Sequence, residues 1–368
     1  MAMTDTARLA MLALPHYVRE KIEPISRKSY LMHEIRNRGL EDYRIGGEDL
    51  RWRPRKRRAE LTWGPGNPNT VTFPQMNLWG AAALDYKTCY MGASVPEIEL
   101  LALQDKSARF FQKVKDIGAQ CAEDFMVRFG PNLYKDGVGA QNLEGFESFG
   151  GYSSYITGEP VGNPSDTYAG LSTALGAEGD WDAPSGGGWP RVDDPDSCDY
   201  EYHYWSPLIV NYNDPALVVD STNETMGWDD CWIYACRYLT THLGIVQMET
   251  PDAIILEADL LRRAKNSLKK DQQFTLDATP KDLDPGIEVL KFDGITFATE
   301  FGVPASTGYA VNFKHLRLKM MGSDFIKTME DTDIATGDKL YRLSWHGNLW
   351  CDSPAYFGFL KAVTSVGT

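Results

Sequence analysis

The sequence predicts an α+β fold in which one long helix lies between two sets of strands. Apolar residues recur every three or four positions from Val95 to Phe129, a spacing typical of an amphipathic helix. Two extended stretches separated by the turn-rich segment GPGNPN at 64–69 predict a long β-hairpin before this helix. Short apolar runs after the helix, such as Ala253 to Leu256, predict buried strands.

The long helix has sequence signals at both ends. Ser94 is in position to cap its N-terminus, and Glu97 three residues later completes a capping-box pattern. Gly130-Pro131 is expected to end it. At about 1.5 Å per residue the helix would be on the order of 50 Å long, so we expect it to be a spine for other elements. Its buried face is expected to contain Ile98, Leu101, Ala108, Phe111, Val114, Gly118, Cys121, Phe125 and Phe129.

The residues before the helix predict an arm and a projecting hairpin. Residues 1–50 contain one predicted helix, from Tyr17 to Arg38, interrupted at Pro24 and closed by Gly39. The basic run RWRPRKRR at 51–58 leads into a predicted strand at 59–63, and a second extended stretch continues to Met91. Because these strands have no core of their own, we expect the hairpin to project from the body.

The residues after the helix predict a mixed α and β region. Residues 132–225 are rich in Gly, Pro, Asp and Tyr, and they include an acidic, Gly/Asp-rich insert at about 150–205. Asp293-Gly294 between two apolar runs is a hairpin signal. Further elements are expected as helices at 228–243 and 259–270 and as strands at 253–256, 309–320 and 340–363.

Charge is distributed unevenly along the 368 residues, whose net charge is −14. Residues 1–60 hold 14 Lys and Arg against 9 Asp and Glu, a net charge of +5, whereas the rest of the chain is strongly acidic. This asymmetry favours contacts between copies of the chain. No apolar run reaches the length of a membrane span, and the N-terminus lacks the pattern of a signal peptide. The six cysteines lack C-x-x-C spacing, so we expect free thiols.

No catalytic, cofactor-binding or metal site is expected from the motifs. GxxxxGK[ST], GxSxG, HExxH and GxGxxG are absent. Cys231 and Cys236 have the wrong spacing for zinc, and the acidic residues between Asp193 and Glu201 lack the spacing of a calcium loop. The basic run at 51–58 could bind nucleic-acid phosphates or the carboxylates of a protein neighbour, and the excess of acid in this chain favours the second.

Several stretches, in the same order along the chain, resemble segments of tailed-phage major capsid proteins. They cover roughly residues 36–362 and include LDYKTCYMGASVPEIE, NLYKDG with LEGFESFGG, DTYAGLS, PDAIILEADLLRRAKNSLKKDQQF, LKFDGITFATEFGVP with YAVNFKHLRLKM, and LSWHGNLWCDSPAYFGFLKAV. The fold of that family, the Hong Kong phage capsid fold, is shared with herpesvirus shells and encapsulins.

The resemblance implies four parts of the chain. Residues 1–50 would be the N-terminal arm and 51–92 the extended loop. Residues 93–131 with 336–368 would form the peripheral domain, and 132–335 the axial domain, which includes the acidic insert. The implied function is that of a major capsid protein, without catalysis or cofactor, which self-assembles into the hexamers and pentamers of an icosahedral shell around double-stranded DNA.

The resemblance also implies partners and contacts. The partners would be further copies of the chain, a scaffold, a portal and cement proteins, with no membrane and no sequence-specific DNA contact, and assembly would take place in the host cytoplasm before the protein resides in the virion. Contacts between subunits are expected from the loop, whose apolar residues would otherwise be exposed; they are Arg55, Arg57, Arg58, Phe73, Met76, Leu78 and Trp79. Alternatives are an encapsulin-like nanocompartment, a glycosidase with paired carboxylates, and a nucleic-acid-binding protein.

Overall fold

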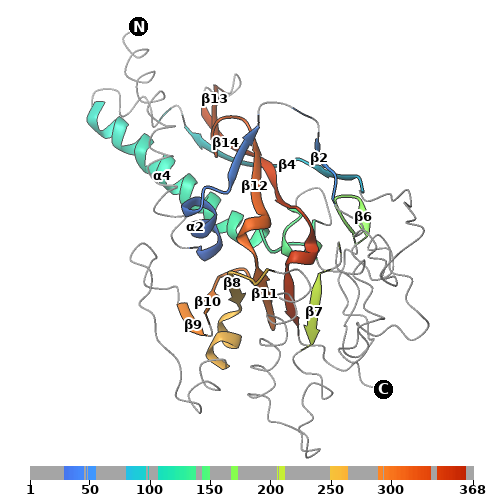
Figure 1. Ribbon diagram of the computed structural model, residues 1–368. Helices are drawn as coiled ribbons and strands as arrows, with labels where there is room; N and C mark the ends of the chain where they lie inside the picture. The colour runs from blue at the N-terminus through green and yellow to red at the C-terminus, as the bar shows by residue number, and fades with distance from the viewer. Residues whose placement is uncertain are drawn as a thin grey trace, which may run out of the picture.

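The computed structural model has two large sheets, two small two-stranded sheets and a long helix (Figure 1). The predicted α+β class is confirmed. Among the described helices, none is long and apolar enough to cross a membrane. The described residues are 29–44, 47, 49–54, 80–96, 98, 107–137, 143–149, 167–172, 205, 207–211, 249–263, 289–292, 294–332 and 338–361.

Strand β14 is the centre of a five-stranded sheet. Gly347 of β14 is opposite both Lys87 and Met320, so β4 and β12 lie on opposite edges of it. Strand β13 pairs with the first half of β14 and β12 with the second half, while β1 adds in parallel to β12. The strands are β1 (Glu41–Arg44), β4 (Lys87–Val95), β12 (Leu316–Met321), β13 (Lys327–Thr332) and β14 (Lys339–Cys351).

The second sheet has six strands in the order β7-β15-β11-β8-β10-β9. Strands β8 and β11 are buried at every residue, which is why the predicted run at 253–256 is entirely apolar. The hairpin predicted at Asp293-Gly294 is confirmed: β9 and β10 pair antiparallel, and Gly294 has a φ of +82°. The strands are β7 (Leu208–Asn211), β8 (Ala253–Leu256), β9 (Val289–Phe292), β10 (Ile295–Thr299), β11 (Thr307–Val311) and β15 (Gly358–Lys361).

Smaller elements complete the described structure. Strands β2 (Asp49–Trp52) and β3 (Ala82–Asp85) pair antiparallel and form the base of the predicted hairpin. A second small ladder joins β5 and β6, and residues 258–263 form a helix directly after β8. The remaining elements are α2 (Tyr30–Asn37), α5 (Phe146–Phe149), β5 (Thr167–Tyr168), β6 (Leu171–Ser172), η3 (Phe313–His315) and η4 (Pro354–Tyr356).

The spine helix is α4 (Ser107–Asn132), and it buries the face that the apolar spacing predicted. Gly118, Phe125 and Phe129 are buried, and the ring of Phe129 lies 4.8 Å from that of Trp345 in β14. Ile98, however, is 77% exposed, so its predicted place on the buried face is wrong. Leu101 and the side chains of Ala108, Phe111 and Val114 lie outside what the structure describes.

Both predicted ends of the spine helix are wrong. Ser94 and Val95 are the last residues of β4, opposite Leu340 and Lys339, so Ser94 is not an N-cap. Here the backbone forms a ladder with β14 and does not start a helix, so the side chains of the capping-box pattern have no helix N-terminus to cap. At the other end α4 continues through Pro131 to Asn132, whose side-chain amide donates to the carbonyl of Arg128 at 2.9 Å. This hydrogen bond gives the carbonyl of Arg128, near the C-terminal end of the helix, a donor from a side chain.

Helix α2 starts later than the sequence predicted. Ser29 is extended and its hydroxyl accepts from the amide of Met32 at 3.2 Å, so the predicted helix does not pass through Ser29; its earlier part, 17–28, lies outside the described residues. A serine N-cap is a strong local start signal, because it satisfies an otherwise unpaired amide. The helix closes as predicted at Gly39, which has a φ of +63°.

The buried carboxylate of Glu300 fixes α2 to the rest of the chain. It accepts hydrogen bonds from the amide of Leu31 at 2.9 Å, from the hydroxyl of Tyr134 at 2.8 Å, and from the hydroxyl of Ser29. Burial raises the pKa of Glu300 above its ordinary value, although the three hydrogen bonds act in the opposite direction. One side chain after β10 therefore joins the start of α2 to the turn after α4.

Replacing Glu300 with Ala should lower the free energy of unfolding by about 3 kcal/mol, because donors from Leu31 and Tyr134 would stay buried without an acceptor. Glu300→Gln keeps an acceptor oxygen and should lose less. Urea unfolding followed by tryptophan fluorescence measures both. The control is Glu34→Ala, which removes a partly exposed pair with Arg38 and should cost less than about 1 kcal/mol. Equal losses for Glu300→Ala and the control would contradict this role.

Candidate functional site

The predicted contact residues of the extended loop, Arg55 to Trp79, lie outside the described residues. The structure does describe where that loop leaves and rejoins the body. The amide of Gly80 donates to the carbonyl of Pro54 at 2.8 Å, directly beyond the β2–β3 ladder. Pro54 and Gly80, the residues on either side of 55–79, are therefore hydrogen-bonded neighbours.

Aromatic packing holds the base of this loop against β14. The ring of Trp52 in β2 lies 5.5 Å from Trp350, 6.2 Å from Tyr168 and 6.5 Å from Trp205. Its indole nitrogen donates to the carbonyl of Asp352 at 3.0 Å. Large aromatic contact areas combined with a hydrogen bond give the loop base a fixed position.

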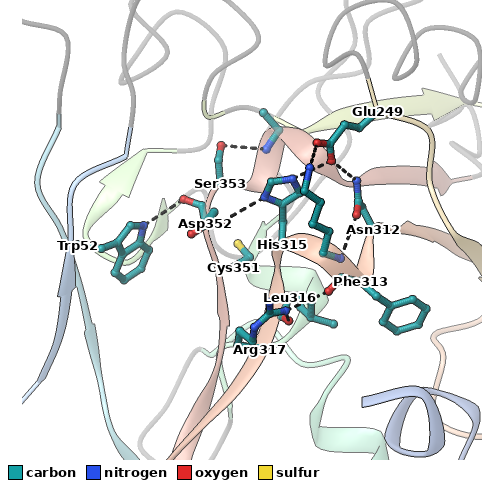
Figure 2. Close-up of polar contacts among 12 residues, drawn as sticks. Trp52, Glu249, Asn312, Phe313, His315, Leu316, Arg317, Cys351, Asp352 and Ser353 are labelled. Atoms are coloured by element: carbon teal, nitrogen blue, oxygen red, sulfur yellow. Dashed lines mark hydrogen bonds and ion pairs between the residues drawn. The ribbon is translucent and has the colours of Figure 1, made fainter. Parts of the chain in front are cut away.

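A polar joint lies beside this packing, where residues before β8, after β11 and after β14 meet (Figure 2). The imidazole of His315 lies between two carboxylates: Nε2 is 2.9 Å from Glu249 and Nδ1 is 3.2 Å from Asp352. The ring stacks on Tyr356 at 3.6 Å between centroids. Asn312 and Lys314 also donate to Glu249. A protonated imidazole would donate to both carboxylates, so the cluster links three segments by charge and hydrogen bonds.

The electrostatics of the joint favour a structural role. Burial alone would raise the pKa of Glu249, but hydrogen bonds from Lys314, His315 and Asn312 outweigh it and lower the pKa to about 2. A carboxylate this acidic is a poor general base near neutral pH. Within the described ranges, no three His, Cys, Asp or Glu side chains gather as metal ligands. Cys89, Cys121 and Cys351 are free thiols as predicted, and the other three cysteines lie outside the described residues.

The structure also reveals an exposed apolar residue that sequence reasoning missed. Phe301 is 82% exposed, yet its neighbours are fixed: Glu300 is buried, and Gly302, with a φ of +106°, packs against Pro131. Val127, one turn before Pro131 on α4, is 54% exposed. An apolar side chain held outward on rigid backbone is a candidate contact site. The sequence gives no signal for it, because a Phe in the run FATEFGVP is equally compatible with a core position.

The low pKa of Glu249 predicts a specific pH dependence. Its folded-state pKa of about 2 lies below its ordinary 4.5, so ionisation stabilises the fold above pH 4.5 and that stabilisation disappears as the pH falls towards 2. Glu249→Gln should therefore lower the thermal midpoint at pH 7, and the difference from the unchanged protein should vanish near pH 2. A difference that stays constant over this range would contradict the assignment.

No protein-family model and no curated protein matches the chain in sequence. Among solved structures, the chain is similar to one from the capsid asymmetric unit of cyanophage A-1(L), with a TM-score of 0.58, 13% identity, and coverage of 94% of this chain and 93% of that chain. It is also similar to chains from the capsids of native and empty GTA particles, with TM-scores of 0.51 and 0.50, 10% identity and 89% coverage of each chain. At these identities the likeness is one of fold. The chain has the tailed-phage capsid fold that the order of its sequence segments predicted.

Proposed function

We propose that this chain is the major capsid protein of a tailed bacteriophage. It would self-assemble into the hexamers and pentamers of an icosahedral shell that encloses double-stranded DNA, without catalysis. The observation that carries the proposal is the end-to-end likeness to a cyanophage capsid chain, which covers 94% of this chain and 93% of the other. Because one fold can serve several functions, surfaces suited to assembly are needed as independent support.

The extended loop supplies such support. Its apolar residues, including Phe73 and Trp79, would be exposed on an arm without a core. Arg57 and Arg58, which belong to the same loop in sequence, would gain little from ion pairs in water and more against a neighbour's carboxylates. The fixed base formed by Trp52 would hold the loop in position for a neighbouring copy. A rigid base lowers the ordering cost of such a contact.

In the proposed division into domains, residues 1–50 are the N-terminal arm and 51–92 the extended loop. Strand β14 packs on α4 through Trp345 and Phe129, which supports grouping 336–368 with 93–131 in a peripheral domain. The sheet of β14 also contains β1, most of β4, β12 and β13 from the other three proposed parts. Strands β8 to β11 fall within the proposed axial domain, 132–335. Strand β15 pairs with β11, so the C-terminal segment also connects the two proposed domains.

The proposed partners are further copies of the chain, with a scaffold, a portal and cement proteins, and the proposed location is the virion after assembly in the host cytoplasm. A nanocompartment around enzyme cargo is the alternative function within the same fold. The contents of native particles distinguish the two: double-stranded DNA supports the capsid proposal, and a protein cargo without DNA supports the alternative.

Replacing residues 64–79 with a short Gly-Ser turn should leave a folded, soluble subunit that forms no shells, because the contact arm is gone while Gly80 still closes its base. Arg57→Glu with Arg58→Glu should also block assembly, more severely than the same positions changed to Ala. Circular dichroism checks folding, and sedimentation with electron microscopy checks assembly. Normal shells from both sets of variants would refute this role of the loop.

Phe301→Ser should weaken assembly while changing the free energy of unfolding by less than about 0.5 kcal/mol, because the side chain is already 82% exposed. The matched variant Phe301→Leu keeps apolar surface and should assemble nearly normally. The yield of shells by sedimentation and the urea midpoint of the dispersed subunit give the two readouts. Unchanged shell yield for Phe301→Ser would remove Phe301 from the interface.

A further inference from the structure

One face of the five-stranded sheet points away from α4. Alternate residues of β14, including Tyr341, Leu343 and Trp345, are buried, and Trp345 packs on α4. The other residues of β14 share the opposite face with their partners in β13 and β4, because directly opposed residues lie on the same side of a sheet. We call this the outer sheet face, and it contains Tyr90, Lys327, Met329, Asp331, Leu340, Arg342 and His346.

The two cations of the outer sheet face form no ion pair with an acid in the described part of the chain. Within the described part of the chain, neither Lys327 nor Arg342 has a carboxylate within 4 Å. Arg342 contacts the sulfur of Met329 at 2.9 Å instead, and its guanidinium carbon lies 5.3 Å from the ring centroid of Tyr90. The pKa of His346 is lowered by partial burial and then by the charges of Lys327 and Arg342. Two cations, Lys327 and Arg342, stand on this face against one acid, Asp331, so the face is locally positive in a chain with a net charge of −14.

Exposed apolar side chains lie among these cations. Tyr90 is 56% exposed, Met329 43% and Leu340 38%. A surface for DNA phosphates needs cations but gains nothing from exposed Met and Leu, and the acidic chain as a whole repels DNA. Mixed aromatic, Met and Arg content is typical of the core of a protein–protein interface. The composition therefore favours a protein partner that is both acidic and aromatic.

The chain itself contains a segment of that composition. Residues 178–201 hold eight Asp and Glu against the single base Arg191, and they also include Trp181, Trp189 and Tyr200. We propose that the outer sheet face of one copy binds residues 178–201 of a neighbouring copy. The inference rests on the proposed function, and it names one interface of the shell. The contact joins two different surfaces, so it can repeat from copy to copy around a ring.

A binding measurement tests the contact without requiring a shell. The probe is a fluorescent peptide of residues 178–201 with Ser in place of Cys198, titrated with dispersed subunit and followed by anisotropy. The peptide should bind the unchanged subunit, more weakly as salt rises. Lys327→Glu with Arg342→Glu should weaken binding at least tenfold. The control Arg262→Glu with Lys291→Glu changes the net charge equally at other exposed positions and should bind normally.

Three results would overturn the proposal. They are no binding of the peptide to the unchanged subunit, equal binding by the reversed variant, and binding of a DNA duplex, but not of the peptide, that depends on Lys327 and Arg342. Should the reversed variant fail to fold by circular dichroism, Lys327→Gln with Arg342→Gln takes its place, with the same expected direction.

A charge exchange tests the contact in assembly. Lys327→Glu with Arg342→Glu should prevent shells, and adding Asp193→Lys, Asp194→Lys, Asp196→Lys and Asp199→Lys in the same chain should restore them. Normal shells from the reversed variant, or a folded exchanged variant that stays dispersed, would contradict the contact. If the unchanged chain forms no shells but binds the peptide, the proposed function fails while the contact stands.

Discussion

Pairing along both edges of β14 is the constraint on which the described structure depends. Its 13 residues hold β4 on one edge and β13 and then β12 on the other. After η4 the chain enters β15 in the six-stranded sheet, so the segment 339–361 belongs to both sheets. Successive side chains of a strand point to opposite faces, so β14 has two different faces. One packs on α4, and the other presents Arg342 and His346. Without β14, β4 and β13 would lose their sheet partner among the described strands, and β12 would pair with β1 alone.

Polar groups, buried at Glu300 and partly buried around His315, fix the points from which exposed surfaces project. Glu300 holds the turn that carries Phe301, and the joint around His315 lies next to the base of the extended loop. Satisfied buried networks are rigid, because an unpaired polar group in the interior is costly. A subunit whose contact residues stand on rigid backbone loses less entropy when it binds a neighbour. Repeated many times in a closed lattice, modest contacts of this kind would suffice for a stable shell.

Local patterns predicted the elements whose signals are local. The apolar run at 253–256, the turn at Asp293-Gly294 and the buried face of α4 follow from periodicity and turn chemistry. The prediction that Ser94 caps the spine helix was wrong because Ser94 pairs with Leu340, a residue far away in sequence, and this pairing overrides the local capping-box pattern. The outer sheet face was invisible because Tyr90, Lys327 and Arg342 come from three strands and meet only through register. The predicted loop contacts, such as Arg57 and Trp79, remain predictions.

The central claim is that this chain assembles with itself into a closed shell. Electron microscopy of native material tests it most directly, with mass spectrometry identifying this chain as the main protein of whatever is imaged. We expect closed icosahedral particles of uniform size in which the chain is the most abundant component. A folded chain found only as dispersed subunits or small soluble complexes, with no particle that contains it, would contradict the account.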